Sequence, residues 1–446
     1  MTSLHPAATR RLPFRPSVAV KVASGINRLS RLLGRGSGTV IGGRVGLAVD
    51  PMLLAVLAKD CDVALVSGTN GKTTTTWMLV AALSEGDSVG VATNTTGANM
   101  PAGHVAALIG TWPVGTVVLE VDEVYLGRLI EDTHPQVVVL LNLSRDQLDR
   151  ISEVRMLVER WRSVLGRLDP VGHGGSRTVV VANADDPMVA WAASTAPEVR
   201  WVGAGQVWRD DAVGCPACGG RIVFEASGSW HCDHCEFGRP DRFAWLEGDV
   251  LALADGRRFP VVIGLPGQFN RANAAMVAVA APELVGTHCQ PPVSIATALE
   301  RLSKLHEVAG RFSTVQRKGR DIRLLLAKNP AGWTAIFDLL DESGDATSPV
   351  VLSINARVAD GFDTSWLWDV PFERLIGRTV VATGERCRDL AVRLRYAEVD
   401  HRVVPDVLEA VDMAIGNAGR LSVATTSTPV EFLGNYTAFA QLRSRL

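Results

Sequence analysis

The sequence predicts an α/β protein whose core is a doubly wound parallel sheet. From about residue 60, short apolar runs rich in Val and Leu alternate with stretches of helical character. A second alternation of the same kind begins near Val315, and a glycine-containing loop, GTNGKT at 68–73, separates the first strand from the first helix. Strands that are apolar throughout are typical of parallel sheets covered by helices on both faces.

The elements follow one another along the chain. Strands are predicted at Asp62–Ser67, Ser88–Ala92, Thr116–Val121, Gln136–Asn142 and Thr178–Ala182, and later at Ile322–Ala327, Val350–Ile354 and Thr379–Thr383. Helices are expected over Thr73–Leu83 and Arg271–Ala281. We therefore divide the chain into a short basic segment (1–55), a central domain (56–308) with an insert (205–247), and a C-terminal α/β, Rossmann-like domain (309–446).

Composition narrows the class of protein. The 446 residues are 47% hydrophobic and 21% charged, with a net charge of −2, as expected for a globular protein that does not bind nucleic acid. No apolar run approaches the roughly 18 residues needed to cross a bilayer, and the start of the chain does not resemble a signal peptide. We expect a cytoplasmic location.

The first 49 residues are basic, with eight Lys and Arg and no Asp or Glu. One interpretation is a solvated leader, which we favour for residues 1–15. The other is an amphipathic helix that contacts anionic lipid headgroups at the inner face of the plasma membrane. The apolar residues that would form its buried side are Val20, Val22, Ile26, Leu29, Leu32 and Leu33.

The loop at 68–73 is predicted to bind phosphate. Glycines let backbone N–H groups curl around phosphate oxygens, and the following helix contributes the positive end of its dipole. The strict pattern G-x-x-x-x-G-K-[ST] is not met, because its first glycine falls on Val66. Glu120 ends a predicted strand, where a carboxylate can hold Mg²⁺ beside the loop, although a solvated acidic cluster would look the same.

Four of the seven cysteines form two C-x₂-C pairs inside the insert, namely Cys215, Cys218, Cys232 and Cys235. Two such pairs with 13 residues between them are typical of a zinc ribbon. Four thiolates form a closed tetrahedral site, so we expect a structural Zn²⁺. The remaining three cysteines are expected to be packed apolar residues.

The motifs resemble those of the Mur ligases, which are ATP-dependent amide-forming enzymes. GTNGKTT, TNTTGANM, LEVDE, LNLSRDQLD, NADDP, LPGQFNRANA and AGRF occur in the family's order between residues 68 and 312. The short N-terminus, Gln147, the four-cysteine insert and the stretches LLAKNPAGW and ADGFDTSWLWDV are similar to those of the MurT branch. The resemblance implies a Mur ligase central P-loop domain with an inserted zinc ribbon.

The resemblance to the MurT branch also implies a reaction, partners and roles for individual residues. In this branch ATP, with Mg²⁺, activates the α-carboxylate of D-glutamate in the lipid II stem peptide as an acyl phosphate. Ammonia from the glutaminase partner GatD then converts it to D-isoglutamine. The implied ATP-binding residues are Gly68, Thr69, Asn70, Gly71, Lys72, Thr73, Thr74, Asn270, Asn273 and Arg311, and the implied Mg²⁺ ligands are Thr73, Thr95 and Glu120. For Asn270 and Asn273 helix capping is the alternative, and for Arg311 an interdomain salt bridge.

The stretch 360–369 is dense in carboxylates beside tryptophans. In related complexes an aspartate of this domain completes the partner's Cys–His pair, where it would orient the histidine. Asp360 is the first choice for this catalytic role, followed by Asp363 and Asp369. The alternative is a capped turn with core tryptophans.

Two other functions remain open from the sequence. One is a folylpolyglutamate-synthase-like ligase that adds an amino acid, against which the C-terminal stretch and the cysteine insert argue. The other is a P-loop binding module without chemistry, against which the presence of both Lys72 and Glu120 argues.

Overall fold

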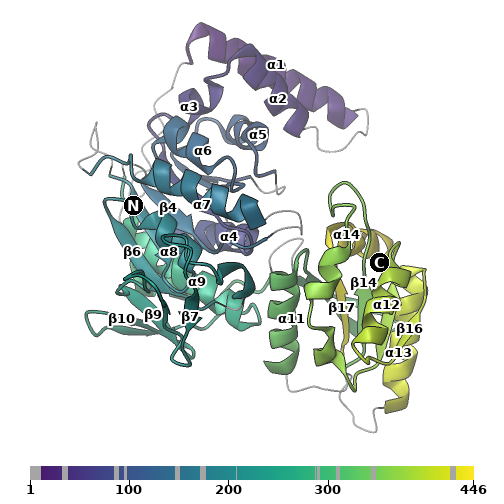
Figure 1. Ribbon diagram of the computed structural model, residues 1–446. Helices are drawn as coiled ribbons and strands as arrows, with labels where there is room; N and C mark the ends of the chain where they lie inside the picture. Colours follow the sequence, from purple (N-terminus) through teal and green to yellow (C-terminus); the bar gives the residue numbers. More distant parts are fainter. Residues whose placement is uncertain are drawn as a thin grey trace.

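The structure is a computed structural model. It describes residues 12–32, 39–84, 90–94, 98–145, 151–170, 177–206, 208–286, 288, 292–307, 312–342, 348–421 and 428–446. Figure 1 shows two α/β bodies side by side, with a hairpin of two helices (purple) at the top of the first body. No helix among the described residues is long and apolar enough to cross a membrane.

The first body is built on a nine-stranded sheet in the order β11-β10-β9-β6-β5-β4-β1-β3-β2. The strands from β9 to β2 run parallel, whereas β10 and β11 form an antiparallel edge. The strands are β1 (Asp62–Ser67), β2 (Val91–Ala92), β3 (Thr116–Glu120), β4 (Val137–Leu140), β5 (Val179–Asn183), β6 (Val199–Gly203), β9 (Ala244–Glu247), β10 (Val250–Leu253) and β11 (Arg258–Pro260).

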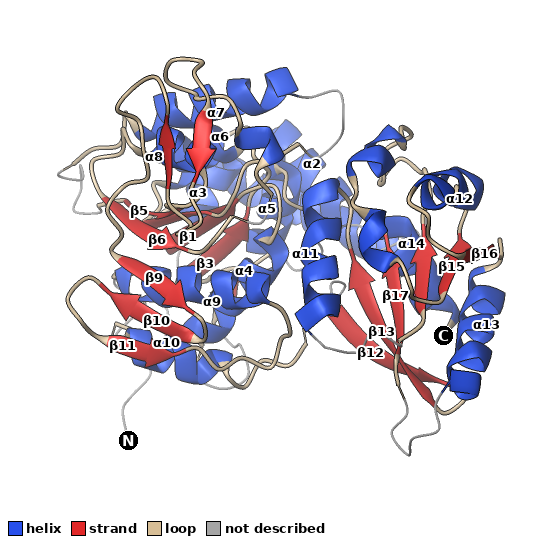
Figure 2. Cartoon of the chain, turned by 60° about the horizontal axis from the view of Figure 1, so that its bottom comes forward, coloured by secondary structure: helices blue, strands red, loops and turns tan. Residues whose placement is uncertain are grey.

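Helices bury both faces of this sheet, which explains the unbroken apolar strands. In β1, Val63 and Leu65 pack against one layer of helices, and Ala64 and Val66 pack against the other. The first layer is α3 (Leu53–Ala58), α5 (Pro101–Thr111), α6 (Leu126–Thr133), α7 (Ile151–Leu165) and α8 (Pro187–Ala193). The second is α4 (Lys72–Leu83), α9 (Gln268–Ala280) and α10 (Ile295–Leu302), as Figure 2 shows.

Two further elements are attached to this body. Helices α1 (Phe14–Leu32) and α2 (Thr39–Val49) form the hairpin, and α2 packs on α5. Its Gly43 lies so close to α5 that an added Cβ would come within 1.8 Å of the Ala102 carbonyl oxygen. The cysteine insert contains a two-stranded sheet, β7 (Ile222–Phe224) and β8 (Trp230–Cys232).

The second body has a six-stranded sheet in the order β12-β13-β17-β14-β15-β16, with only β12 antiparallel. Its strands are β12 (Phe312–Arg317), β13 (Arg320–Leu326), β14 (Val350–Ser353), β15 (Val380–Thr383), β16 (His401–Val403) and β17 (Val430–Gly434). Helices α11 (Pro330–Glu342) and α12 (Cys387–Tyr396) cover one face, and α13 (Val407–Leu421) and α14 (Tyr436–Arg445) cover the other.

The predicted α/β class is confirmed, and each strand predicted from the sequence has a counterpart. The sequence prediction lacked several strands, and β17 is the most important of these because it lies in the middle of the second sheet. The last residues of the range expected for the insert, Ala244–Glu247, form β9 and pair with β6 of the large sheet.

Candidate active site

A cavity of about 760 Å³ lies between the two bodies. Its walls come from the loop after β1, the ends of β3 to β6, the start of α9, the cysteine insert and the start of α11. Because β1 and β3 to β6 are parallel, their carboxyl ends meet at one edge, where open α/β sheets bind ligands. Lining residues include Lys72, Thr73, Glu120, Asn142, Asn183, Arg239, Asn270, Asn273 and Lys328.

The loop predicted to bind phosphate opens α4 as expected. Gly71, the residue before the helix, has φ 86°, a left-handed conformation that favours glycine. Asn142, two residues after β4, holds the loop. It accepts a hydrogen bond from the Asn70 N–H (2.9 Å) and donates one to the Asn70 carbonyl (3.0 Å). The loop backbone is therefore shaped before any ligand binds.

The Lys72 side chain is folded back over this loop. Its Nζ donates to the carbonyl oxygen of Gly68 at 2.5 Å and forms a salt bridge with Glu123 Oε2 at 3.0 Å. Lys72 is 6% exposed. An anion entering the cavity therefore meets a buried ammonium group at the amino end of a helix, where the helix dipole also favours negative charge.

Thr73 and Glu120 meet from different elements. The Thr73 hydroxyl donates a hydrogen bond to Glu120 Oε2 at 2.8 Å, and the Asn99 side-chain amide lies 3.5 Å from Oε1. Glu120 is 2% exposed, which rules out the solvated acidic cluster considered above. A hydroxyl and a carboxylate are hard oxygen donors of the kind that Mg²⁺ prefers, so these residues fit that ion.

The Glu120 backbone is fixed by hydrogen bonds to two side chains that the sequence did not single out. Asn94 accepts from the Glu120 N–H (2.9 Å) and donates to its carbonyl (2.8 Å), and His104 Nε2 lies 2.8 Å from the same carbonyl. His104 is fully buried, and burial lowers its pKa to about 4, partly opposed by this hydrogen bond. The ring is therefore neutral at pH 7 and donates from Nε2 to the carbonyl. Asn94 stands in the motif TNTTGANM, which was the available signal.

The two asparagines of α9, Asn270 and Asn273, both line the cavity. Asn270 donates from Nδ2 to the Pro266 carbonyl at 2.6 Å, so its amide also ties the first turn of the helix to the preceding loop. Asn273 lies against the phosphate loop, since a Cβ on Gly71 would be 3.0 Å from Asn273 Oδ1. Thr95 and Arg311 lie outside the described residues, and their roles remain predictions.

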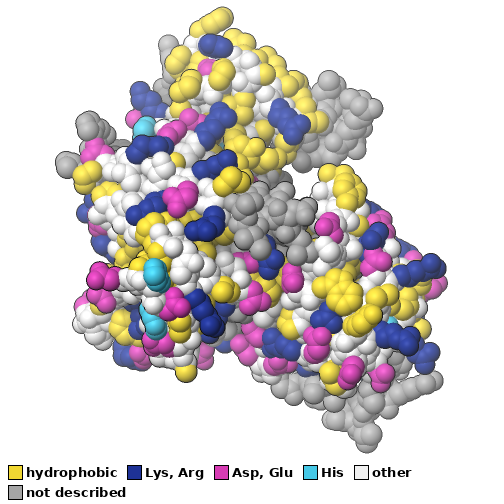
Figure 3. Space-filling model, in the orientation of Figure 1, with side chains coloured by type: hydrophobic (Ala, Val, Ile, Leu, Met, Phe, Trp, Pro, Cys, Tyr) yellow, Lys and Arg dark blue, Asp and Glu magenta, His cyan; other side chains and the backbone are white. Residues whose placement is uncertain are grey.

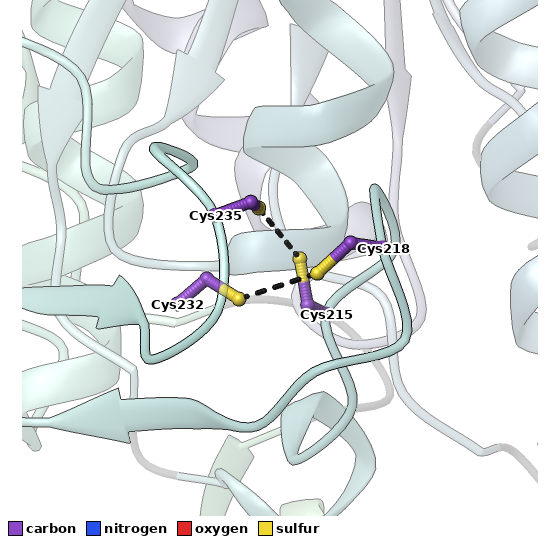
Figure 4. Close-up of side chains that lie close together, drawn as sticks. All are labelled: Cys215, Cys218, Cys232 and Cys235. Atoms are coloured by element: carbon purple, nitrogen blue, oxygen red, sulfur yellow. Dashed lines mark hydrogen bonds between the residues drawn. The ribbon is translucent and has the colours of Figure 1, made fainter.

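The four cysteines of the insert converge. Their sulfur atoms all lie within 4.8 Å of one another, and none of the four is in a disulfide, so the cluster can hold a metal ion. Figure 4 shows the two pairs facing each other, with Cys215 opposite Cys235 (3.8 Å) and Cys218 opposite Cys232 (3.5 Å). Burial raises the pKa of the Cys232 thiol. Hydrogen bonds from the His234 and Cys235 backbones, together with those to the Cys218 and Cys215 side chains, outweigh this and lower the pKa to about 7.

The insert also forms a wall of the cavity, which the sequence did not reveal. Trp230 of β8 is 1% exposed and donates from its indole to the Ala184 carbonyl, in the loop after β5 (3.0 Å). Arg239 lies 3.3 Å from Asp185, whose other oxygen accepts from the Gly205 N–H at 2.7 Å. Insert residues Phe224, Ser227, Gly228 and Arg239 line the cavity together with the phosphate loop. The insert is therefore continuous with the site.

The three C-terminal aspartates lie in different surroundings. Asp360 is 8% exposed and accepts hydrogen bonds from the Thr437 N–H (2.9 Å) and the Thr437 hydroxyl. Asp363 is exposed and accepts from the N–H and hydroxyl of Ser365, capping a short turn. Asp369 is half-buried and lies 3.9 Å from Arg145 of the first body.

Comparison with known proteins first defines the class. Residues 66–281 match the Mur ligase middle domain. The fold is similar to a solved pseudomurein peptide ligase type C from Methanothermus fervidus (TM-score 0.59, 20% identity, covering 86% of this chain and 79% of that one). A parallel sheet with a phosphate loop, joined to a second α/β body across a cavity, is therefore the Mur ligase fold.

The family within this class follows from the second body and from whole-chain similarity. Residues 326–439 match the MurT ligase C-terminal family. The chain is 31% identical to the MurT subunit of glutamine-hydrolysing lipid II isoglutaminyl synthase from Streptococcus pneumoniae, over 82% of this chain and 83% of that protein. It is 28% identical to the Staphylococcus aureus subunit over 97% of this chain and 98% of the relative. The chain belongs to the MurT family.

Proposed function

We propose that this protein amidates the α-carboxylate of D-glutamate in the lipid II stem peptide, forming D-isoglutamine at the expense of ATP. The observation that carries the proposal is the buried contact of Thr73 with Glu120, beside Lys72 and the phosphate loop, in a member of the MurT family. These groups are the ones that a phosphoryl-transfer site needs, namely an anion-binding loop, a fixed cation and hard oxygen ligands.

The reaction has two steps. First, a carboxylate oxygen of the substrate attacks the γ-phosphorus of ATP, giving an acyl phosphate and ADP. Ammonia then attacks the acyl carbon, inorganic phosphate leaves, and the nitrogen loses a proton to give the amide. Lys72 and the N–H groups of the loop neutralise charge on the phosphoryl oxygens, which is where such catalysis mainly arises. Thr73 and Glu120 would hold Mg²⁺, which supplies further charge neutralisation.

We assign the orientation of ATP from the order of the strands. Glu120 ends β3 on one side of β1, whereas Asn142 just after β4 and Asn183 at the end of β5 lie on the other. With the metal ligands on the β3 side, the nucleoside extends over β4 and β5, towards Asn270, Asn273 and the insert. Gly68 to Thr74 then contact the phosphates, and the predicted Arg311 joins from the start of the second body.

The metal of the insert is proposed to be Zn²⁺. Four cysteine sulfurs in two C-x₂-C turns are a donor set typical of closed tetrahedral zinc sites, which are structural. Cys215 and Cys218 precede β7, whereas Cys232 ends β8 and Cys235 follows it. This two-stranded sheet is too small to have a substantial core of its own. Zinc would therefore hold the part of the insert that lines the cavity.

The ammonia is proposed to come from a glutaminase partner, GatD. The second body exposes four large apolar side chains, those of Val358, Phe362, Trp368 and Tyr396. The Trp368 ring packs edge-on against the Tyr396 ring, with 5.3 Å between the ring centroids. Exposed aromatic residues are typical of protein interfaces. Asp360, Asp363 and Asp369 are in the same stretch of chain, and one of them would complete the partner's glutaminase site. We propose that the pair works in the cytoplasm at the inner face of the plasma membrane, because the proposed reaction combines ATP with a lipid-linked substrate.

A folylpolyglutamate-like ligase is a weaker alternative, because residues 326–439 match the MurT C-terminal family. The test is to incubate the full chain with the co-expressed glutaminase, ATP, glutamine and lipid II, and to analyse the lipid II by mass spectrometry. The proposal requires the small mass loss that accompanies replacement of a hydroxyl by an amino group. A mass gain of one amino-acid residue would support the alternative, and unchanged lipid II would contradict both. We also propose that the chain divides into a basic N-terminal segment (1–55), a central domain (56–308) and a C-terminal domain (309–446). The insert of the central domain (205–247) ends in β9, which belongs to the large sheet.

A further inference from the structure

The α1–α2 hairpin presents apolar side chains to solvent. Phe14 is 86% exposed and Ile41 is 52% exposed, and Val18 and Val22 are each more than a third exposed. Phe14, Val18 and Val22 are four residues apart, so they form one stripe along α1. Figure 3 shows hydrophobic side chains gathered over this end of the molecule, interspersed with Lys and Arg.

Packing of the hairpin does not require this stripe. The opposite side of α1 is already buried through Ala19 and Ala23, which are fully inaccessible. Gly46 of α2 packs next to Leu53 of α3, where an added Cβ would be 3.0 Å from the leucine. Single exposed apolar residues are ordinary, but an apolar stripe along one helix, with a further exposed apolar residue on the helix paired with it, is typical of a surface that binds something.

The charge of the hairpin indicates what it binds. Arg15, Lys21, Arg28 and Arg44 are exposed on α1 and α2, and neither helix contains a carboxylate. Lys21 is next to Val22 of the apolar stripe. Lysine is depleted from protein–protein interfaces, whereas basic residues beside a few apolar side chains suit an anionic lipid surface.

We propose that the α1–α2 hairpin docks the protein on the anionic headgroups of a membrane. Phe14, Val18, Val22 and Ile41 enter the headgroup layer while the basic side chains remain at the phosphates. A small apolar surface and a few charges act together here, since neither alone gives stable binding.

The position of the hairpin connects it to the site. α2 packs on α5, and α5 begins at Pro101, two residues after Asn99, which lies beside Glu120. The hairpin therefore lies at the metal end of the cavity, where the acyl phosphate would form. This part of the inference rests on the proposed function, because it assumes a lipid-linked substrate whose carboxylate enters at that end.

The test is flotation of the full chain with vesicles that contain no lipid II, so the result does not depend on the enzymatic proposal. Vesicles of phosphatidylcholine alone are compared with vesicles containing phosphatidylglycerol. The double variants Phe14→Glu/Ile41→Glu and Lys21→Glu/Arg44→Glu are compared with a matched control on the second body, Val358→Glu/Phe362→Glu. ADP affinity, measured by calorimetry, reports whether each variant is folded.

The native chain and the control should float with anionic vesicles only, and binding should fall with added salt. Each hairpin variant should bind about tenfold less while retaining its ADP affinity. Equal flotation with neutral vesicles, or none with anionic ones, would overturn the proposal. So would hairpin variants that bind vesicles normally but change the protein's mass in light scattering, because the surface would then join protein chains.

Discussion

The hydroxyl of Thr73, in the first turn of α4, donates a 2.8 Å hydrogen bond to Oε2 of Glu120 at the end of β3. The two residues are 47 positions apart in the chain and are both buried. Because β1 and β3 pair in parallel, with Val66 opposite Glu120, the phosphate loop and this carboxylate must emerge at the same edge. The contact therefore follows from strand register.

We expect Glu120→Gln to abolish most of the amidation. The amide is nearly isosteric with the carboxylate and can still bond to Thr73, but it is a much poorer ligand for Mg²⁺. The value of kcat should fall by about 100-fold or more, as it does when one group that stabilises transition-state charge is lost. Asp122→Asn, at a neighbouring carboxylate that binds the Val124 N–H, is the control. Similar losses in the two variants would contradict the assignment.

His104 should make stability depend on pH. The folded protein favours the neutral ring, with a pKa of about 4, whereas the ordinary pKa of a histidine is 6.5. The stability that this difference contributes is present above pH 6.5 and is lost as the pH falls towards 4, by up to about 3 kcal/mol.

Urea unfolding of the native chain and of His104→Gln, in metal-free buffer at several pH values, measures this effect. The stability advantage of the native chain should shrink as the medium becomes acidic. His231→Gln, at an exposed residue of the insert, is the matched variant. A native-minus-variant difference that stays constant with pH would show that the ring is not held neutral by burial.

Loss of the insert metal should weaken nucleotide binding. Cys218→Ser removes one thiolate at an exposed position, so the cluster should no longer hold the metal. Without the metal, the part of the insert that carries Phe224 and Arg239 should no longer be held against the cavity. The Kd for ADP should rise about tenfold, equivalent to about 1.4 kcal/mol.

Elemental analysis measures the zinc content of the variant, and calorimetry measures its affinity for ADP. Cys387→Ser, at a buried cysteine of the second body, should retain both the zinc and the native affinity. If Cys218→Ser lost its zinc and still bound ADP normally, the insert would not support the nucleotide site.

Substitution of the C-terminal aspartates should affect amidation that uses glutamine differently from amidation that uses added ammonium. Asp360→Asn in the complex with the glutaminase should reduce glutamine-dependent amidation on the order of 100-fold or more, because the partner's histidine would lose its orienting carboxylate. Amidation with added ammonium should be nearly unchanged.

Asp363→Asn and Asp369→Asn are the comparison variants in the same assay. The Asp360 carboxylate is held by Thr437, whereas that of Asp363 caps an exposed turn. A selective loss of glutamine use in Asp363→Asn would move the role to that residue. Equal loss of both activities in Asp360→Asn would indicate that the side chain only supports the fold.

Local sequence patterns predicted the fold class and several chemical groups of the candidate site. The apolar strands, the phosphate loop and the paired cysteines are each contained in a short stretch. The physical demands on each are local, so the sequence patterns were enough to predict the α/β class and the cysteine cluster. The central strand β17 was not predicted, because five residues (VEFLG) next to a loop do not stand out from other short apolar runs.

The sequence by itself determined which chemical groups the protein has, namely an anion-binding loop, a carboxylate at the end of a strand and a four-thiol cluster. Only the tertiary structure decided which groups meet. Strand order brings Glu120 to Thr73, and burial makes His104 a neutral donor to the Glu120 backbone. The packing of Trp230 against the loop after β5 turns the insert into a cavity wall. Contacts of this kind join residues tens of positions apart, and a linear pattern does not encode the register and packing that create them.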